Sequence, residues 1–299
     1  MRRLLVALAF FAGCAVTLAF LVLPIVALFT HVAPGTLLHQ LASPVVGDAL
    51  LVSLKTSVTA QLLIVLFGTP TAYLLATRRF AGRSALVTLV ELPIVLPPAA
   101  AGIGLIVAFG RVGLLGGTFS ALGIDVAFNQ AAVVIAVSFV AGPFYVRQAI
   151  AAFEAVDGQL ILASRTLGAG PWRTFVRVVV PLASGGLAAG AAFSLARGLG
   201  EFGATIMFAG SLQGVTQTLP LAIYYEFDVN LNAAIAIAAL LVVIAAAILL
   251  SLKLSSLWAS SRSASRYRYA TSSSSASSSS KSRSGNAKRT ERWPTASSV

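Results

Sequence analysis

Six long apolar stretches constrain the fold of this chain more than any other feature. Each has the length, about 20 residues, that a helix needs to cross the hydrocarbon core of a bilayer. The stretches are residues 4–30, 50–77, 86–109, 131–150, 182–208 and 231–252. Only 10% of all residues are charged, against about 25% in a typical soluble domain. We therefore expect an all-α integral membrane protein with about six transmembrane helices.

Lysine and arginine are distributed unevenly between the two sides of these stretches. If the N-terminus lies in the cytoplasm, ten basic residues before the tail fall on the inner side and Arg111 alone falls outside. Short cytoplasmic loops of membrane proteins are enriched in lysine and arginine. We therefore expect a multi-pass protein of the cytoplasmic membrane, in contact with membrane lipid and with both termini cytoplasmic.

Residues 255–299 differ in composition from the rest of the chain. Serine fills almost all of positions 272–280, and the segment beyond Ser260 carries +7 of the formal net charge of +12. Such a segment buries too little apolar area to offset the entropy lost on ordering. We expect residues 1–254 to form the transmembrane domain and residues 255–299 a disordered, Ser-rich basic tail. The tail is either a solvated extension or a segment that binds anionic lipid.

The sequence gives little support for nucleotide, metal or nucleic-acid binding. No Walker A pattern occurs, and Gly198-x-Gly200-x-x-Gly203, which matches a dinucleotide-binding pattern, lies in an apolar stretch with no strand before it. These glycines indicate instead either close packing of helix backbones or a place where the helix unwinds. His31 and His39 have no suitably spaced partner for a metal site. The basic tail and the inner loops account for the net charge, so no nucleic-acid partner is expected.

The connection between the fourth and fifth stretches, residues 154–181, is long and basic. We expect a short helix over residues 163–167 that ends at Gly168, because glycine readily adopts the left-handed conformation found at helix ends. Gly170 and Pro171 then predict a turn.

A second helical piece is expected over residues 172–179, before Pro181 opens the next span. It would expose Trp172 and Phe175, which a plain connecting loop does not require. A helix-turn-helix tethered at both ends to the membrane is poorly suited to DNA binding. The loop therefore favours docking of a cytoplasmic protein.

Two stretches contain residues that are unusual inside a membrane span. Pro93, Pro97 and Pro98 predict a kinked or broken helix. Arg197 and Glu201 are four residues apart, which places them on one helix face. Ionisable groups inside a membrane are costly and often mark a pathway. These residues indicate either a translocation pathway lined by Arg197, Glu201, Pro97 and Pro98, or a proline kink and a neutralising pair needed only for packing.

The loop at 154–181 resembles the coupling loop of permease subunits of ABC importers. The core pattern of that loop is Glu-Ala-Ala, three residues, glycine and, later, Leu-Pro. The corresponding residues here are Leu162, Ala163, Ser164, Gly168, Val180 and Pro181. Leucine replaces the glutamate and serine the second alanine, which changes the polar contacts at these positions but not the expected shape of the loop.

Longer strings resemble the molybdate, tungstate and sulfate permease family. They are TLGAGPWRTFVRVVVPL with ARGLGEFGATIMFAG, ELPIVLPPAAAGIGL, SFVAGPFYVR and TQTLPLAIY, and the resemblance extends over about residues 50–252. It implies an ABC importer permease core in which two permease subunits, expected to be identical, form one pathway.

The resemblance also implies the partners and the division of labour. An ABC ATPase subunit would bind the loop, and a separate extracytoplasmic binding protein would deliver a tetrahedral oxyanion, with molybdate favoured over tungstate or sulfate. ATP would be used by the ATPase, so this chain would bind no cofactor and carry no catalytic residue. The residues expected to contact the ATPase are Ala163, Ser164, Gly168, Trp172, Arg173 and Pro181. A secondary transporter that works without an ATPase is a less favoured alternative.

Overall fold

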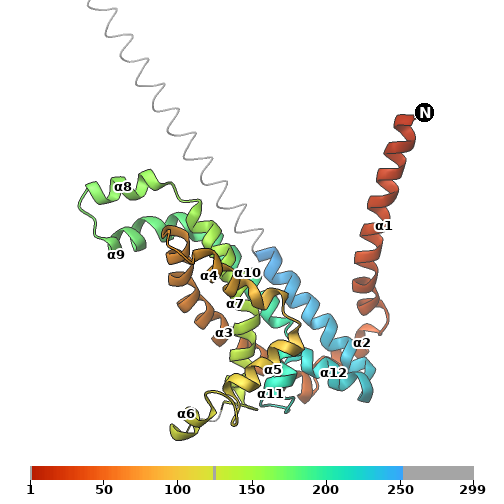
Figure 1. Cartoon of the computed structure of the whole chain (residues 1–299). Coiled ribbons are helices and arrows are strands. Elements are labelled where there is room, and N and C mark those ends of the chain that lie inside the picture. Colours follow the sequence, from red (N-terminus) through yellow and green to blue (C-terminus); the bar gives the residue numbers. More distant parts are fainter. Residues whose placement is uncertain (1, 124–125, 252–299) are drawn as a thin grey trace, which may run out of the picture. The chain divides into compact units, whose positions relative to one another are not determined.

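The computed structural model describes residues 2–123 and 126–251 of the chain. The chain divides into two units, Met1–Leu252 and Lys253–Val299, and the predicted tail at 255–299 lies outside the described residues. Every regular element in the described part is a helix (Figure 1). The elements are α1 (Arg2–Thr30), α2 (Pro34–Leu41), α3 (Pro44–Thr77), α4 (Arg83–Val95), α5 (Pro98–Phe109), α6 (Gly116–Ala121), α7 (Gln130–Glu154), α8 (Gly158–Thr166), α9 (Pro171–Thr174), the π-helical segment η1 (Phe175–Val179), α10 (Val180–Leu199), α11 (Gly203–Ala209), α12 (Leu219–Val229) and a final helix over Leu231–Ser251.

Five of these helical segments are long and apolar enough to cross a membrane. They are Arg2–Thr30, Pro44–Thr77, Gln130–Glu154, Pro171–Leu199 and Leu231–Ser251. A sixth candidate span is the pair α4 and α5, which bends by 115° at its break. The expectation of an all-α membrane protein with about six spans is confirmed. The cytoplasmic location of both termini stays a prediction.

The third and fifth predicted spans are interrupted. Between α4 and α5, Leu96 is extended at φ −65° and ψ 133°, because the residue before a proline is disfavoured in helical conformation. The prediction of one helix over residues 182–208 is wrong at both ends. The helix begins earlier, at Pro171, and stops at Leu199, and α11 begins only at Gly203.

Helix α7 is the centre of the domain and lies against both α3 and α10. Small residues on α10 allow the two helix backbones to approach closely. A Cβ atom added at Gly186 would lie 2.5 Å from the Cβ of Ala152, and one at Gly198 would lie 2.9 Å from the Cγ1 of Val137. Gly190 also packs directly on α7. This contact fixes the height and rotation of α10, and therefore the position of Arg197 near its end.

Helix α1 makes almost no contact with the rest of the described chain. None of its residues is buried, although an 18-residue stretch within it has a mean hydropathy of 2.6, high enough for a membrane span. A helix that is apolar all round is stable only in lipid or against other apolar helices. α1 is therefore a candidate membrane span whose surface the rest of the described chain leaves uncovered.

Candidate functional site

Helices α8 and α9 form a hairpin that extends from one end of α7 and α10 (Figure 1). Asp157 caps the start of α8 by accepting a hydrogen bond from the backbone N–H of Gln159 at 2.9 Å. Gly168 has φ +83°, and the N–H of Ala169 donates to the carbonyl of Ser164 at 3.1 Å, which is a glycine-based helix end. The predicted helix, turn and second helix are confirmed, with a longer first helix than expected.

The second helix of the hairpin continues without interruption into α10. The helix runs from Pro171 to Leu199, so the prediction that Pro181 begins a separate span is wrong. Pro181 lacks a backbone donor, and it lies two residues after the π-helical segment η1. The hydroxyls of Ser164 and Thr174 lie 3.1 Å apart and tie α8 to this helix.

The outer surface of the hairpin is exposed and partly apolar. Leu167 and Trp172 are 88% and 75% exposed. Phe175, in contrast, was expected to be exposed but is partly buried, with its ring centroid 4.6 Å from that of Tyr73 and 6.2 Å from that of Phe153. Of the residues predicted to contact an ATPase, all but Ser164 are exposed. These exposed residues are Ala163, Gly168, Trp172, Arg173 and Pro181.

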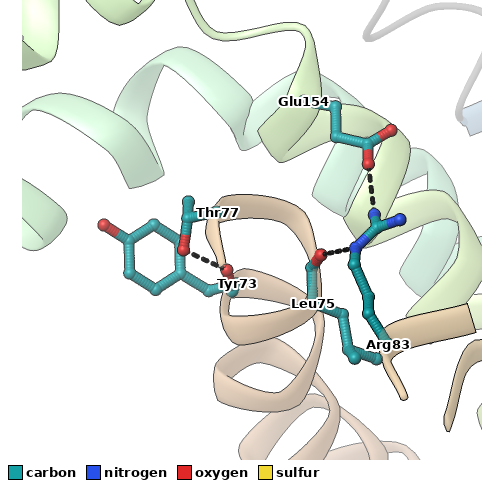
Figure 2. A network of polar contacts seen from close by, with 5 residues as sticks. All are labelled: Tyr73, Leu75, Thr77, Arg83 and Glu154. Carbon is teal, nitrogen blue, oxygen red and sulfur yellow. Dashed lines mark hydrogen bonds and ion pairs between the residues drawn. The ribbon is translucent and has the colours of Figure 1, made fainter. Parts of the chain in front are cut away.

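Arg83 joins the base of the hairpin to the end of α3 (Figure 2). Its Nε donates to the backbone carbonyl of Leu75 at 2.6 Å, and its Nη2 donates to Oε1 of Glu154 at 2.7 Å. Glu154 is the last residue of α7, so the pair connects the ends of two spans where the hairpin starts. The two side chains are 71 positions apart in sequence, and sequence analysis missed them because no local pattern relates them.

The two helix breaks meet in space. Pro97 and Pro98 lie at the start of α5, and Gly203 lies at the start of α11. A Cβ atom at Gly203 would lie 2.5 Å from the Cβ of Pro98, and one at Gly102 would lie 2.6 Å from the Cβ of Met207. The two short helices therefore pack against each other, which brings the predicted pathway prolines close to the segment that holds Glu201.

Arg197 and Glu201 form an ion pair at the α10–α11 break. Nη1 of Arg197 lies 2.9 Å from Oε2 of Glu201, and Oε1 of Glu201 accepts a hydrogen bond from the backbone N–H of Ala204 at 2.8 Å. The Glu201 side chain is 1% exposed, whereas that of Arg197 is 32% exposed. Glu201 therefore compensates the arginine and caps α11, and only the arginine reaches an open surface of this chain.

Comparison with known proteins identifies the family. Residues 64–255 match the family described as the binding-protein-dependent transport system inner membrane component. The chain belongs to this family. It is 42% identical over 209 residues to the molybdenum transport system permease protein ModB of Mycobacterium tuberculosis, covering 70% of this chain and 79% of that protein. ModB of Escherichia coli K12 is 42% identical over 178 residues, covering 59% and 78%.

A sulfate permease and two solved transporters are more distant. CysW, the sulfate transport system permease protein of Synechococcus elongatus, is 35% identical over 176 residues, covering 59% of this chain and 62% of CysW. A bacterial alginate ABC transporter has a TM-score of 0.66 at 18% identity, covering 84% of this chain and 93% of that chain. The MetNI methionine ABC transporter has a TM-score of 0.54 at 21% identity, covering 69% and 91%. These structures support the fold.

The stretch matched to the transport system family contains both candidate regions. The hairpin and the two helix breaks lie inside residues 64–255, whereas α1, α2 and the first part of α3 precede them. Among the residues that the structure describes, no group of three His, Cys, Asp or Glu side chains could hold a metal ion.

Proposed function

We propose that this chain is the permease subunit of an ATP-driven ABC importer that carries a tetrahedral oxyanion, most favourably molybdate, into the cell. The observation that carries the proposal is the 42% identity over 209 residues to a molybdenum permease. The CysW match is lower, at 35% over 176 residues, and it makes a sulfate permease the second candidate. Membership of the family supports a multi-pass protein whose ATP hydrolysis belongs to a separate ATPase subunit.

The hairpin is proposed as the docking element for that ATPase. Its exposed Trp172 and Leu167 offer apolar surface, and Arg173 offers charge. Since the helix from Pro171 to Leu199 contains no loop, a displacement of the hairpin would be carried to the α10–α11 break, about 43 Å away along 29 residues. Closure of the ATPase would in this way open and close the pathway on alternate sides.

The pathway is proposed to run past the two helix breaks. Arg197, Pro97 and Pro98 face open space on this chain, and Glu201 holds Arg197 in place. Broken helices are tolerated in a membrane where they line a water-filled cavity. An oxyanion passing here would meet a compensated arginine and the backbone amides at the start of α5, which are weak partners suited to release.

Two copies of this chain, a pair of ATPase subunits and an extracytoplasmic oxyanion-binding protein would complete the importer. Both termini would be cytoplasmic, because this orientation leaves Arg111 as the sole basic residue of the outer loops. Lipid would cover the remaining apolar surface. The chain itself would bind no cofactor, and the binding protein would make most of the choice between molybdate, tungstate and sulfate.

Radiolabelled molybdate uptake tests the proposal. Uptake is measured in cells that lack this chain and in the same cells with the chain restored, with tungstate or sulfate as competitor. We expect uptake to return with the chain, to be inhibited by tungstate at low excess and to be inhibited by sulfate only at high excess. Equal inhibition by sulfate would assign the chain to sulfate transport, and uptake that does not depend on the chain would refute the oxyanion importer.

A further inference from the structure

A basic cavity lies beside the hairpin, and the transport proposal assigns no ligand to it. Its volume is about 1090 Å³, which is comparable to the upper range of ligand pockets, about 1,000 Å³. The end of α3, the start of α4, the end of α7 and the hairpin surround it. The charged residues that line it are Arg78, Arg79, Arg83, Arg165 and Glu154.

The positive charge of this cavity is mostly uncompensated. Glu154 pairs with Arg83 at 2.7 Å. Within residues 2–123 and 126–251, no carboxylate pairs with Arg78, Arg79 or Arg165. Like charges gathered on one cavity repel each other, and an anion bound among them would remove that repulsion. Guanidinium groups are well suited to a phosphate because they donate two parallel hydrogen bonds.

Apolar surface leads from the membrane-spanning part of α3 into the same cavity. Pro70 and Leu74 line the cavity, and Phe67 lies on the same face of α3 one and two turns earlier. Phe67 is 65% exposed and Leu74 is 51% exposed. Trp172 also lines the cavity, and tryptophan is enriched where a membrane meets water. The cavity therefore combines a charged end with an apolar approach.

We propose that this cavity binds the headgroup of an anionic phospholipid, with the acyl chains along the Phe67–Leu74 face of α3. The inference rests on the orientation in the proposed function, which places this end of α3 at the inner leaflet. Basic pockets between transmembrane helices on that side bind acidic headgroups. A free phosphate shares the charge chemistry but would make no use of the apolar approach.

Native mass spectrometry of the purified full-length chain tests this site, with phosphatidylglycerol and phosphatidylcholine supplied at equal concentration. We expect selective binding of phosphatidylglycerol. The variant Arg78→Gln/Arg79→Gln/Arg165→Gln should bind it about tenfold more weakly or worse. The control Arg2→Gln/Arg3→Gln/Arg177→Gln removes the same number of charges outside the cavity and should retain binding. Wild-type affinity in the first variant would overturn the proposal, as would a tenfold loss in the control.

A second measurement leaves the arginines in place. In a Trp258→Phe/Trp293→Phe chain, Trp172 is the sole remaining tryptophan of three. Phosphatidylglycerol with brominated acyl chains should quench its fluorescence more than brominated phosphatidylcholine does. Equal quenching would contradict a headgroup site.

Two further experiments distinguish a lipid headgroup from a free anion and from the ATPase. Displacement of the lipid by millimolar inorganic phosphate would show a site for a free anion instead. A triple variant that keeps phosphatidylglycerol but loses a copurifying ATPase would assign the arginines to the ATPase interface. All these readouts are independent of molybdate uptake, so the lipid site and the transport function can fail separately.

Discussion

Replacing Arg197 by alanine separates the two interpretations of the intramembrane ion pair. Glu201 is 1% exposed and has two partners, the guanidinium of Arg197 and the backbone N–H of Ala204. Removing the arginine leaves a buried carboxylate with a single hydrogen bond. The first expected effect of Arg197→Ala is therefore a loss of folding stability, before any effect on transport.

The size of this loss follows from the burial of the pair. Removing one partner of a fully buried ion pair costs about 3–5 kcal/mol. The Arg197 side chain is 32% exposed and Glu201 keeps its bond to Ala204, so we expect about 2–3 kcal/mol. Glu201→Gln keeps an oxygen that can accept that bond and removes the charge. The double variant Arg197→Ala/Glu201→Gln should therefore have a free energy of unfolding about 1–2 kcal/mol higher than that of Arg197→Ala.

Thermal unfolding of the purified chain in detergent measures these differences. The single variant should unfold about 4–10 °C below the wild type, and the exposed control Arg177→Ala should change little. An Arg197→Ala variant that unfolds at the wild-type temperature would refute the dependence of Glu201 on Arg197. Molybdate uptake by the double variant then distinguishes the roles: normal uptake indicates a packing pair, and a stable but inactive double variant indicates a pathway residue.

Three further substitutions test the hairpin and its supports. Gly168→Val places a β-branched residue at φ +83° and should lose the copurifying ATPase, whereas Gly170→Ala, at φ −67°, should keep it. Arg83→Glu should lower the molybdate transported per ATP hydrolysed, and the exchanged pair Arg83→Glu/Glu154→Arg should restore it. Gly186→Leu should lower the thermal unfolding temperature several-fold more than the control Gly185→Leu does. A side chain at Gly186 meets Ala152 of α7, whereas one at Gly185 enters open space.

The hairpin could be predicted from sequence because its signals are local. Gly168 and the Gly170-Pro171 pair mark the turn by their own backbone preferences. The start of α8 could also have been predicted, since Asp157 is a favourable N-cap residue. The predicted helix nevertheless began at residue 163, five residues after the observed start at Gly158. The continuity through Pro181 could not be predicted, because proline is common in the first turn of a helix and therefore favours a helix start.

The residues proposed to line a pathway stay a prediction, and the way the structure brings them together could not be predicted from the sequence. Charge and proline content singled out Arg197, Glu201 and the two prolines, since such residues are unusual in apolar stretches. Hydropathy continues across the α10–α11 break, however, so one span was expected over residues 182–208, and unwinding at the glycines from Gly198 to Gly203 was only one of two interpretations of that pattern. The approach of Gly203 to Pro98 joins positions more than 100 residues apart, and a single sequence carries no signal of that pairing.

The π turn of η1 has a consequence for how the hairpin and α10 are linked. A π turn holds one residue more than an α turn. If Phe175–Val179 relaxed to α-helical geometry, everything beyond it would rotate by about 100° and move by about 1.5 Å relative to the hairpin. Because Gly186, Gly190 and Gly198 pack α10 directly on α7, such a change would turn the hairpin surface relative to Arg197. The angle between the hairpin and α10 is thus set by five residues next to the proposed docking surface, at the far end of the helix from the ion pair.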